Sequence, residues 1–139
     1  MRSALKNLTV NKTSVFFPVE NLTRELDFRL LMAVLAARPN RRIFVGHPWR
    51  FQPIYGVVEE GIYVGKTFLN PSTPRSDLRG YERLKRQNIS VILLEEEGAV
   101  FPEDEDSWRS YLDHRLDPSI FQEDDVVLTW GEFQASHYR

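Results

Sequence analysis

The chain has 139 residues, which is the usual length of one domain and is short for two. Eighteen Lys and Arg against twenty Asp and Glu leave a formal net charge of −2, so bulk charge gives no reason to expect a nucleic-acid-binding protein. Cysteine is absent, which excludes disulfides and thiol chemistry, and three scattered histidines give no pattern for a zinc site or another metal site.

The N-terminal residues 1–12 are polar and mixed, and we expect them to be a loose lead-in to one domain over residues 13–139. They lack the apolar core of a signal peptide, and no segment reaches the ~18 apolar residues that cross a bilayer. A chain without cysteine fits a reducing setting, so we expect a cytoplasmic location.

Short apolar runs alternate along the chain with segments in which apolar residues recur at helical spacing. This alternation predicts a three-layer α/β domain, with a mainly parallel five-stranded sheet and helices on both faces. The predicted strands are Thr13–Val19, Arg42–Gly46, Gly61–Gly65, Ser90–Leu94 and Asp124–Trp130.

The first predicted helix begins near Asn21, a good N-cap residue, and ends before Pro39. Further helical segments are Trp49–Val58 after Pro48, Leu78–Lys85, Trp108–Leu112 with Ser107 as N-cap, a short one opened by Pro118, and Phe133–Arg139. The apolar positions that recur at helical spacing and predict the first helix are Leu22, Leu26, Leu30, Ala33, Val34 and Ala37.

The strand Ser90–Leu94 runs directly into Glu95-Glu96-Glu97-Gly98. Adjacent carboxylates repel one another, so the pKa of at least one can be raised toward the range of a general base. Gly98 allows a sharp turn or the close approach of a ligand. The alternative is a solvated acidic turn with no chemical role.

Other charged residues follow the remaining predicted strands, and the carboxyl ends of parallel strands are where open α/β sheets bind ligands. The helix dipole alone explains acids such as Glu20 and Glu25 in a first turn, whereas Arg24 opposes it and is expected to pair with an acid or face a ligand. We expect Glu20, Arg24 and Lys66 to share one cleft with the Glu96-Glu97 pair, while Asp113 and Glu123 lie elsewhere.

Two further strand-end residues carry alternatives. His47 precedes Pro48 and is either a helix cap or a cleft residue, with the cap favoured because a lone histidine is weak evidence for function. Gly131-Glu132 places a small residue and an acid after the last strand.

The chain carries five motifs in order, and together they resemble the N-terminal region of a bacterial surface carbohydrate biosynthesis family. They are Phe17-Pro-Val-Glu20 with Arg24-Glu-Leu-Asp27, Gly46-His47, Gly61-Ile-Tyr-Val-Gly-Lys66, Glu95-Glu-Glu-Gly98 and Trp130-Gly-Glu132. The resemblance extends from about Ser14 onward. Such proteins are similar to two-domain glycosyltransferases of the GT-B kind, and Glu96-Glu97-Gly98 is similar to a motif of sialic acid and Kdo transferases.

The resemblance implies a Rossmann-like domain that binds a carbohydrate acceptor, with Glu97 as first choice and Glu96 as second choice of general base. It further implies that Glu20, Arg24, His47, Lys66, Gly98 and Glu132 bind substrate. A nucleotide-linked sugar, with a CMP-linked one as a candidate, would be held by a C-terminal donor domain that this sequence lacks. Homo-oligomerisation and a location at the inner face of the membrane are also expected.

The main alternative is a non-catalytic, flavodoxin-like module that binds a partner protein. A receiver domain is disfavoured because the predicted first strand ends in Pro18-Val-Glu20 and the third in Gly65-Lys66, without the acids that receivers need. A dinucleotide-binding domain is disfavoured because no Gly-x-Gly-x-x-Gly follows the first strand.

Overall fold

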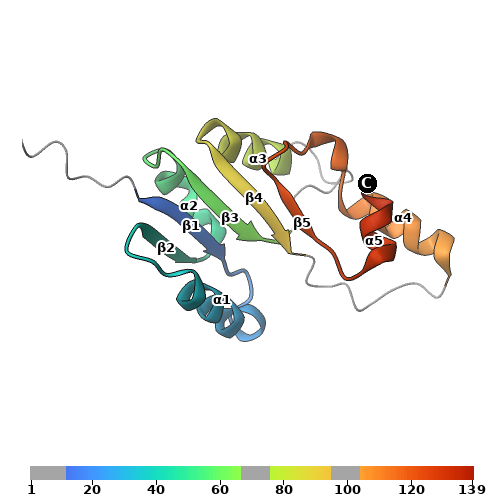
Figure 1. Ribbon diagram of the computed structural model, residues 1–139, viewed down its shortest axis with the longest axis horizontal. Coiled ribbons are helices and arrows are strands. Elements are labelled where there is room, and N and C mark those ends of the chain that lie inside the picture. Colours follow the sequence, from blue (N-terminus) through green and yellow to red (C-terminus); the bar gives the residue numbers. More distant parts are fainter. Residues whose placement is uncertain (1–11, 67–75, 95–103) are drawn as a thin grey trace, which may run out of the picture.

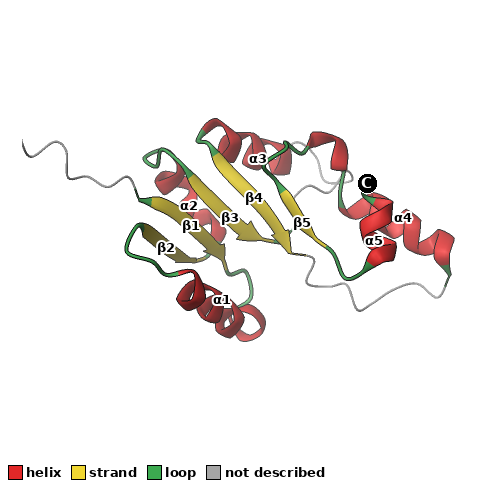
Figure 2. Cartoon of the chain, viewed as in Figure 1, coloured by secondary structure: helices red, strands yellow, loops and turns green. Residues whose placement is uncertain are grey.

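The computed structural model describes residues 12–66, 76–94 and 104–139, and in these ranges strands and helices alternate (Figure 1, Figure 2). Five strands form one parallel sheet in the order β2-β1-β3-β4-β5. The strands are β1 (Thr13–Pro18), β2 (Arg41–Gly46), β3 (Gly61–Gly65), β4 (Ile89–Leu94) and β5 (Val126–Leu128). The helices are α1 (Leu22–Ala36), α2 (Pro48–Tyr55), α3 (Ser76–Arg86), α4 (Glu105–Arg115), the 3-10 turn η1 (Pro118–Ile120) and α5 (Glu132–His137).

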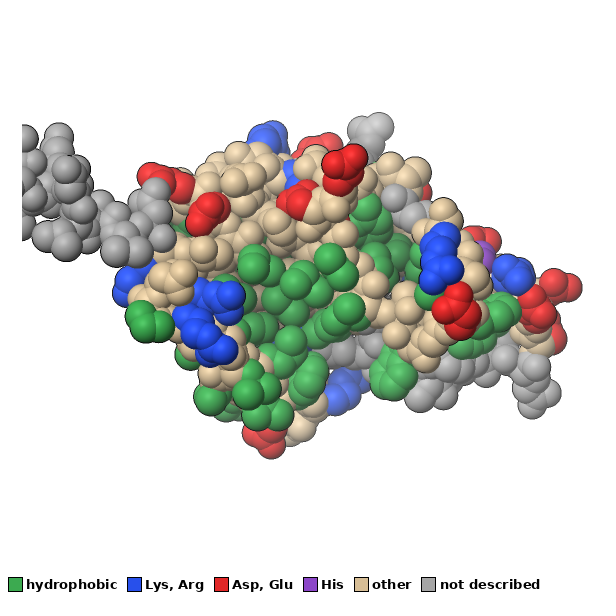
Figure 3. Space-filling view, viewed as in Figure 1, with side chains coloured by type: hydrophobic (Ala, Val, Ile, Leu, Met, Phe, Trp, Pro, Cys, Tyr) green, Lys and Arg blue, Asp and Glu red, His purple; other side chains and the backbone are tan. Residues whose placement is uncertain are grey.

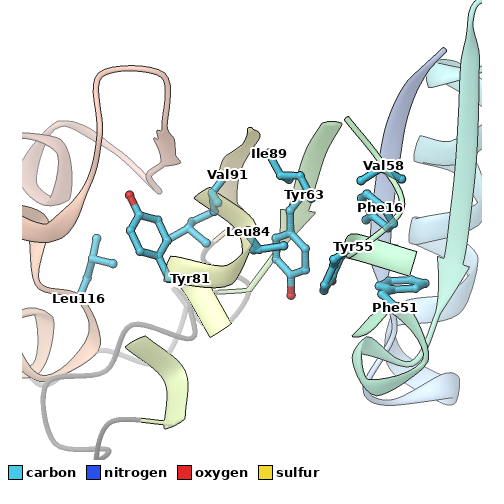
Figure 4. Close-up of a cluster of buried hydrophobic side chains, with 11 residues drawn as sticks. Phe16, Phe51, Tyr55, Val58, Tyr63, Tyr81, Leu84, Ile89, Val91 and Leu116 are labelled. Carbon is cyan, nitrogen blue, oxygen red and sulfur yellow. The ribbon is translucent and has the colours of Figure 1, made fainter. Parts of the chain in front are cut away.

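The two faces of the sheet carry different helices. One face packs on α2 and α3 through a cluster that includes Phe16, Tyr55, Tyr63 and Leu84 (Figure 4). The other face packs on α1 through Ala33 and the half-buried side chains around it. These layers confirm the predicted three-layer, Rossmann-like α/β domain. Parallel strands need crossover helices, and right-handed crossovers that run in opposite directions along the sheet place their helices on opposite faces.

The strand order reverses between β1 and β3. The chain moves outward from β1 to β2 through α1, then returns across β1 to β3 through α2. The carboxyl ends of two neighbouring strands therefore lead to opposite sides of the sheet at this point, which is the place where doubly wound sheets leave a crevice for ligands.

The predicted first helix is present as α1, but of the apolar residues that recur along it only Ala33 is fully on the side that the helix buries. The helix buries Glu25, Arg29 and Ala33, while Leu22 and Val34 are 70% and 71% exposed. The buried residues are spaced four apart and so lie on one face. That rotation brings the Glu25 carboxylate to Lys66, an ion pair that apolar periodicity cannot anticipate.

Helix starts follow local hydrogen bonds. The Asn21 side chain accepts from the backbone N–H groups of Thr23 and Arg24, at 3.1 and 3.3 Å, and so caps α1 as predicted. The predicted cap of α4 is wrong: Asp104 accepts from the N–H of Ser107 at 2.8 Å, so the helix starts at Glu105 and Ser107 lies within it. The carboxylate is as good a cap as the hydroxyl and starts the helix one turn earlier.

Strand β5 is shorter than predicted because the chain turns through Asp124 and Asp125 before it. The fully buried Asp125 carboxylate accepts from the N–H of Val91 at 2.9 Å, from Lys85 Nζ at 2.9 Å and from the Tyr81 hydroxyl at 2.5 Å. Burial raises the pKa of Asp125, but these donors outweigh it and hold the pKa below the usual value. These contacts hold β5 against β4 and α3 at the amino edge of the sheet.

None of the helices in the described ranges has the length and apolarity of a membrane span.

Candidate functional site

The candidate site lies at the carboxyl edge of the sheet, where the order reverses. Pro18 of β1 is in register with Gly46 of β2, and the N–H of Val19 donates to the Gly46 carbonyl at 2.8 Å. β3 lies on the other side of β1 and leads into Lys66. The chain segments that begin at Val19, His47 and Lys66 therefore leave the sheet side by side.

Glu25 is the centre of this edge. Lys66 Nζ lies 2.6 Å from Glu25 Oε1, and the backbone N–H of Glu20 donates to Glu25 Oε2 at 2.8 Å. The side chains of Glu25 and Lys66 are 2% and 16% exposed. Burial raises the pKa of Glu25, but the bonds from Lys66 and from the backbone amides of Glu20 and Asn21 outweigh it and lower the pKa from 4.5 to about 2. Glu25 is therefore an ionised carboxylate at neutral pH.

Arg24 adds a second cation to the same carboxylate. Its Nη2 lies 3.6 Å from Glu25 Oε1, and its side chain is 60% exposed. This contact agrees with the expectation that a cation in the first turn pairs with a nearby acid. The Arg24 side chain is mostly exposed beside a buried ion pair, and a guanidinium has the hydrogen-bond donors that suit an anionic ligand at the sheet edge.

Gly65 allows β1 and β3 to end so close together. A Cβ at this position would meet Pro18 Cγ at 2.6 Å and Tyr63 Cε1 at 2.7 Å, both far inside van der Waals contact. The Tyr63 ring lies in the cluster on the α2–α3 side of the sheet, and burial raises the pKa of its hydroxyl, with smaller effects of Tyr55 and Glu20. Tyr63 is thus a neutral, structural neighbour of Lys66.

The residues predicted for the site are thus brought together only in part. Arg24 and Lys66 converge on Glu25, and Glu20 joins them through its backbone while its side chain is exposed. Sequence analysis overlooked Glu25, because the helix dipole already explained an acid at that position.

His47 has the capping role that the sequence favoured. Its Nδ1 accepts from the backbone N–H of Trp49 at 3.4 Å, and Pro48 starts α2. The Trp49 ring is 80% exposed and lies edge-on to the imidazole, with 6.2 Å between ring centroids. An exposed indole is therefore present at the same edge of the sheet as Arg24 and Lys66.

Glu132 is separated from this group. It lies on α5 after β5, and β4 stands between β5 and β3. Its carboxylate is 77% exposed and lies 3.2 Å from Arg139 Nη1. Asp113 pairs with His137 at 2.8 Å on the α4–α5 side, and Glu123 is exposed before the amino end of β5, so both lie away from the switch point, as expected.

Glu96, Glu97 and Gly98 lie outside the described residues, so the assignment of the general base remains a prediction. The strand that leads to them is described: Leu93 of β4 is in register with Gly65 of β3. The chain thus leaves β4 at the same edge as Lys66. Within the described ranges, no three His, Asp or Glu side chains are grouped as a metal site requires.

Comparison with known proteins gives no match to a family model, to a curated protein or to a solved structure. The resemblance to surface carbohydrate biosynthesis proteins therefore depends on the sequence motifs alone. Any function must be argued from the residues at the carboxyl edge.

Proposed function

We propose that this chain is the acceptor-side domain of a glycosyltransferase that builds surface polysaccharide. The observation that carries the proposal is the cluster of Lys66, Glu25 and Arg24 at the β1/β3 switch point. Ligands of doubly wound sheets bind at such a point. The motifs from Phe17 to Glu132 supply the class of ligand, a carbohydrate.

The charges at this edge favour an acceptor that carries a carboxylate. Lys66 already neutralises the buried Glu25, whereas the Arg24 guanidinium is mostly exposed. Arginine binds carboxylates with two parallel hydrogen bonds, and such charge-assisted bonds are about twice as strong as neutral ones. The exposed Trp49 ring offers a flat apolar surface for a sugar at the same edge.

The proposed chemistry needs a base and a donor. Glu97, or Glu96 in second place, takes the proton of an acceptor hydroxyl while that oxygen attacks the anomeric carbon and the nucleotide departs with the bonding electrons. Both residues follow β4, which ends beside β3. A second, donor-binding domain would hold the nucleotide-linked sugar, for which a CMP-linked sugar is a candidate. Such chemistry belongs in the cytoplasm, at the inner face of the membrane.

A flavodoxin-like partner-binding module is the second candidate. The strand order β2-β1-β3-β4-β5 is that of flavodoxin-like sheets, and the exposed outer side of α1 is unusually apolar. This candidate predicts no selective binding of sugars at the carboxyl edge, which separates it from the first.

The test is the affinity of the whole chain for glucuronate, with glucose as the neutral probe, measured by titration calorimetry. We expect glucuronate to bind more tightly, and Arg24→Gln to weaken its binding about tenfold or more, because a hydrogen bond to a charged group contributes ~1.5–3 kcal/mol. Arg42→Gln is the matched control, because Arg42 is also exposed but lies at the amino end of β2. Equal affinities for both sugars, or equal loss in both variants, would contradict the proposal.

A further inference from the structure

Among the described residues, the side of the sheet that carries α1 is only partly covered. α1 packs near β1 and β2, whereas Ile62 of β3 and Ile92 and Leu94 of β4 stay half-buried on this side. In β5, Val127 packs into the opposite cluster, so the alternating Val126 and Leu128 point to the α1 side, where they are 44% and 49% exposed. Figure 3 shows apolar side chains gathered across this face.

The C-terminal half of α1 is apolar on both its inner and its outer side. From Leu30 to Ala37 the sequence has no polar residue. Leu31, Val34 and Leu35 on the outer side are 55%, 71% and 66% exposed. A helix that is apolar all round is typically buried on all sides, so a second apolar surface is expected to cover the outer side of α1.

We infer that this face, formed by the outer side of α1 and the uncovered side chains of β3, β4 and β5, is the interface of a two-fold symmetric homodimer. We refer to it as the α1 face. The inference does not depend on the proposed function. Parallel sheets are normally buried on both faces, but no described helix packs on these side chains of β3, β4 and β5. In the same way, no described apolar surface packs on the outer side of α1. A two-fold axis buries both surfaces at once, because the outer side of α1 in each copy packs on the strands β3, β4 and β5 of the other copy.

The area of the α1 face fits a dimer. The most exposed apolar side chains of this face are Phe28, Leu30, Leu31, Val34, Leu35, Val126 and Leu128, which are 44–71% exposed. A fully exposed side chain of this kind has roughly 60–120 Å² of apolar area. Because about half of each is exposed, the seven side chains together expose about 200–450 Å². A stable interface buries about 800 Å² per partner, a little more than half of it apolar, so the α1 face supplies the apolar part of one standard interface.

The distribution of charge also favours a second copy. The exposed charged residues of α1 are Arg24 and Asp27, both in its first two turns, and from Leu30 to Ala36 the helix carries no charge. An apolar centre with charges at its margin is the pattern of a protein interface. Because the helix and the uncovered strands that complement each other occur on one chain, no second kind of protein is needed to complete the interface.

The first test is the sedimentation velocity of the whole chain over a range of micromolar concentrations. We expect a dimer, and we expect Val34→Glu to weaken it about 10–100-fold or more, because a charge buried without a partner is strongly unfavourable. Val57→Glu is the matched control, since Val57 is 78% exposed and follows α2, outside the α1 face. A monomer at every concentration, or a dimer that Val34→Glu leaves intact, would overturn the inference.

The second test does not require the dimer to be disrupted. Because the chain has no cysteine, Leu35→Cys gives one site for a spin label. In a mixture with unlabelled, ¹⁵N-enriched chain, we expect the label to broaden the amide signals of Ile92 and Val126 on the other copy. A label at Val57→Cys should leave these signals sharp. Absence of this intermolecular broadening, or broadening on the α2–α3 side instead, would show that another surface or another partner is involved and would overturn the inference.

Discussion

Replacement of Lys66 by Met leaves the Glu25 carboxylate buried without its nearest cation. The two side chains are 2% and 16% exposed, and 2.6 Å separates Lys66 Nζ from Glu25 Oε1. Removal of one partner from a buried pair costs about 3–5 kcal/mol. The Glu20 amide and Arg24 remain near the carboxylate, so we expect a somewhat smaller loss, about 2–4 kcal/mol of unfolding free energy at pH 7.

The pair also makes stability depend on pH. The pKa of Glu25 falls from 4.5 in the unfolded chain to about 2 in the folded one, which corresponds to about 3 kcal/mol. Because the folded pKa is the lower one, this stabilisation is complete above pH 4.5 and is lost as the pH falls toward 2. We expect Lys66→Met to raise the pKa of Glu25, so that the variant loses less stability than the parent between pH 5 and pH 2.

Urea unfolding, followed by tryptophan fluorescence, measures these free energies. The double variant Glu25→Gln/Lys66→Met removes both charges, and we expect it to be more stable than the two single losses predict, with a coupling of at least about 1.5 kcal/mol. A loss below about 0.5 kcal/mol for Lys66→Met, or additive losses in the cycle, would refute the assignment of Glu25 and Lys66 as a buried pair.

Two further comparisons test the fold by thermal melts. Asp125→Asn should lower the free energy of unfolding by about 2–3 kcal/mol, because the oxygens of Asp125 accept hydrogen bonds from buried donors. Asp124→Asn should cost less, since the Asp124 side chain is 51% exposed. Equal losses in the two variants would contradict the hydrogen-bond network described at the amino edge of the sheet. Gly65→Ala should destabilise the fold by about 1–3 kcal/mol, because a Cβ at this position meets Pro18 Cγ at 2.6 Å. Gly80→Ala in α3 should stabilise it by about 0.5–1 kcal/mol, because a Cβ there meets nothing within 4 Å. Unchanged stability of Gly65→Ala would contradict the close approach of β1 and β3.

The sequence predicted the sheet well because its strands are short apolar runs with turn residues between them. The sequence does not give the orientation of α1, for a physical reason. Leu30 to Ala37 is apolar throughout, so apolar spacing does not distinguish the inner side from the outer side. The usable signal was polar: Glu25 and Arg29 are four residues apart on one side of the helix, and both are buried.

The sequence could predict which residues share the site only as far as it could predict the order of the strands in the sheet. The rule that ligands bind at carboxyl strand ends brought Arg24 and Lys66 together correctly. The resemblance also counted Glu132 among the substrate-binding residues, although β5 is the edge strand and β4 separates it from β3. The sequence alone does not give the strand order, and it could not show that Glu25 belongs to the site.

The most direct test of the central claim is to map where an acidic sugar binds on the parent chain. Backbone amide shifts, recorded by NMR during titration with glucuronate, report the location without any substitution. The account predicts that the shifts concentrate at Glu20, Arg24, Gly65 and Lys66, around the Glu25 carboxylate. Shifts confined to the amino edge, around Asp125 and Lys85, or no shifts at millimolar glucuronate, would contradict it.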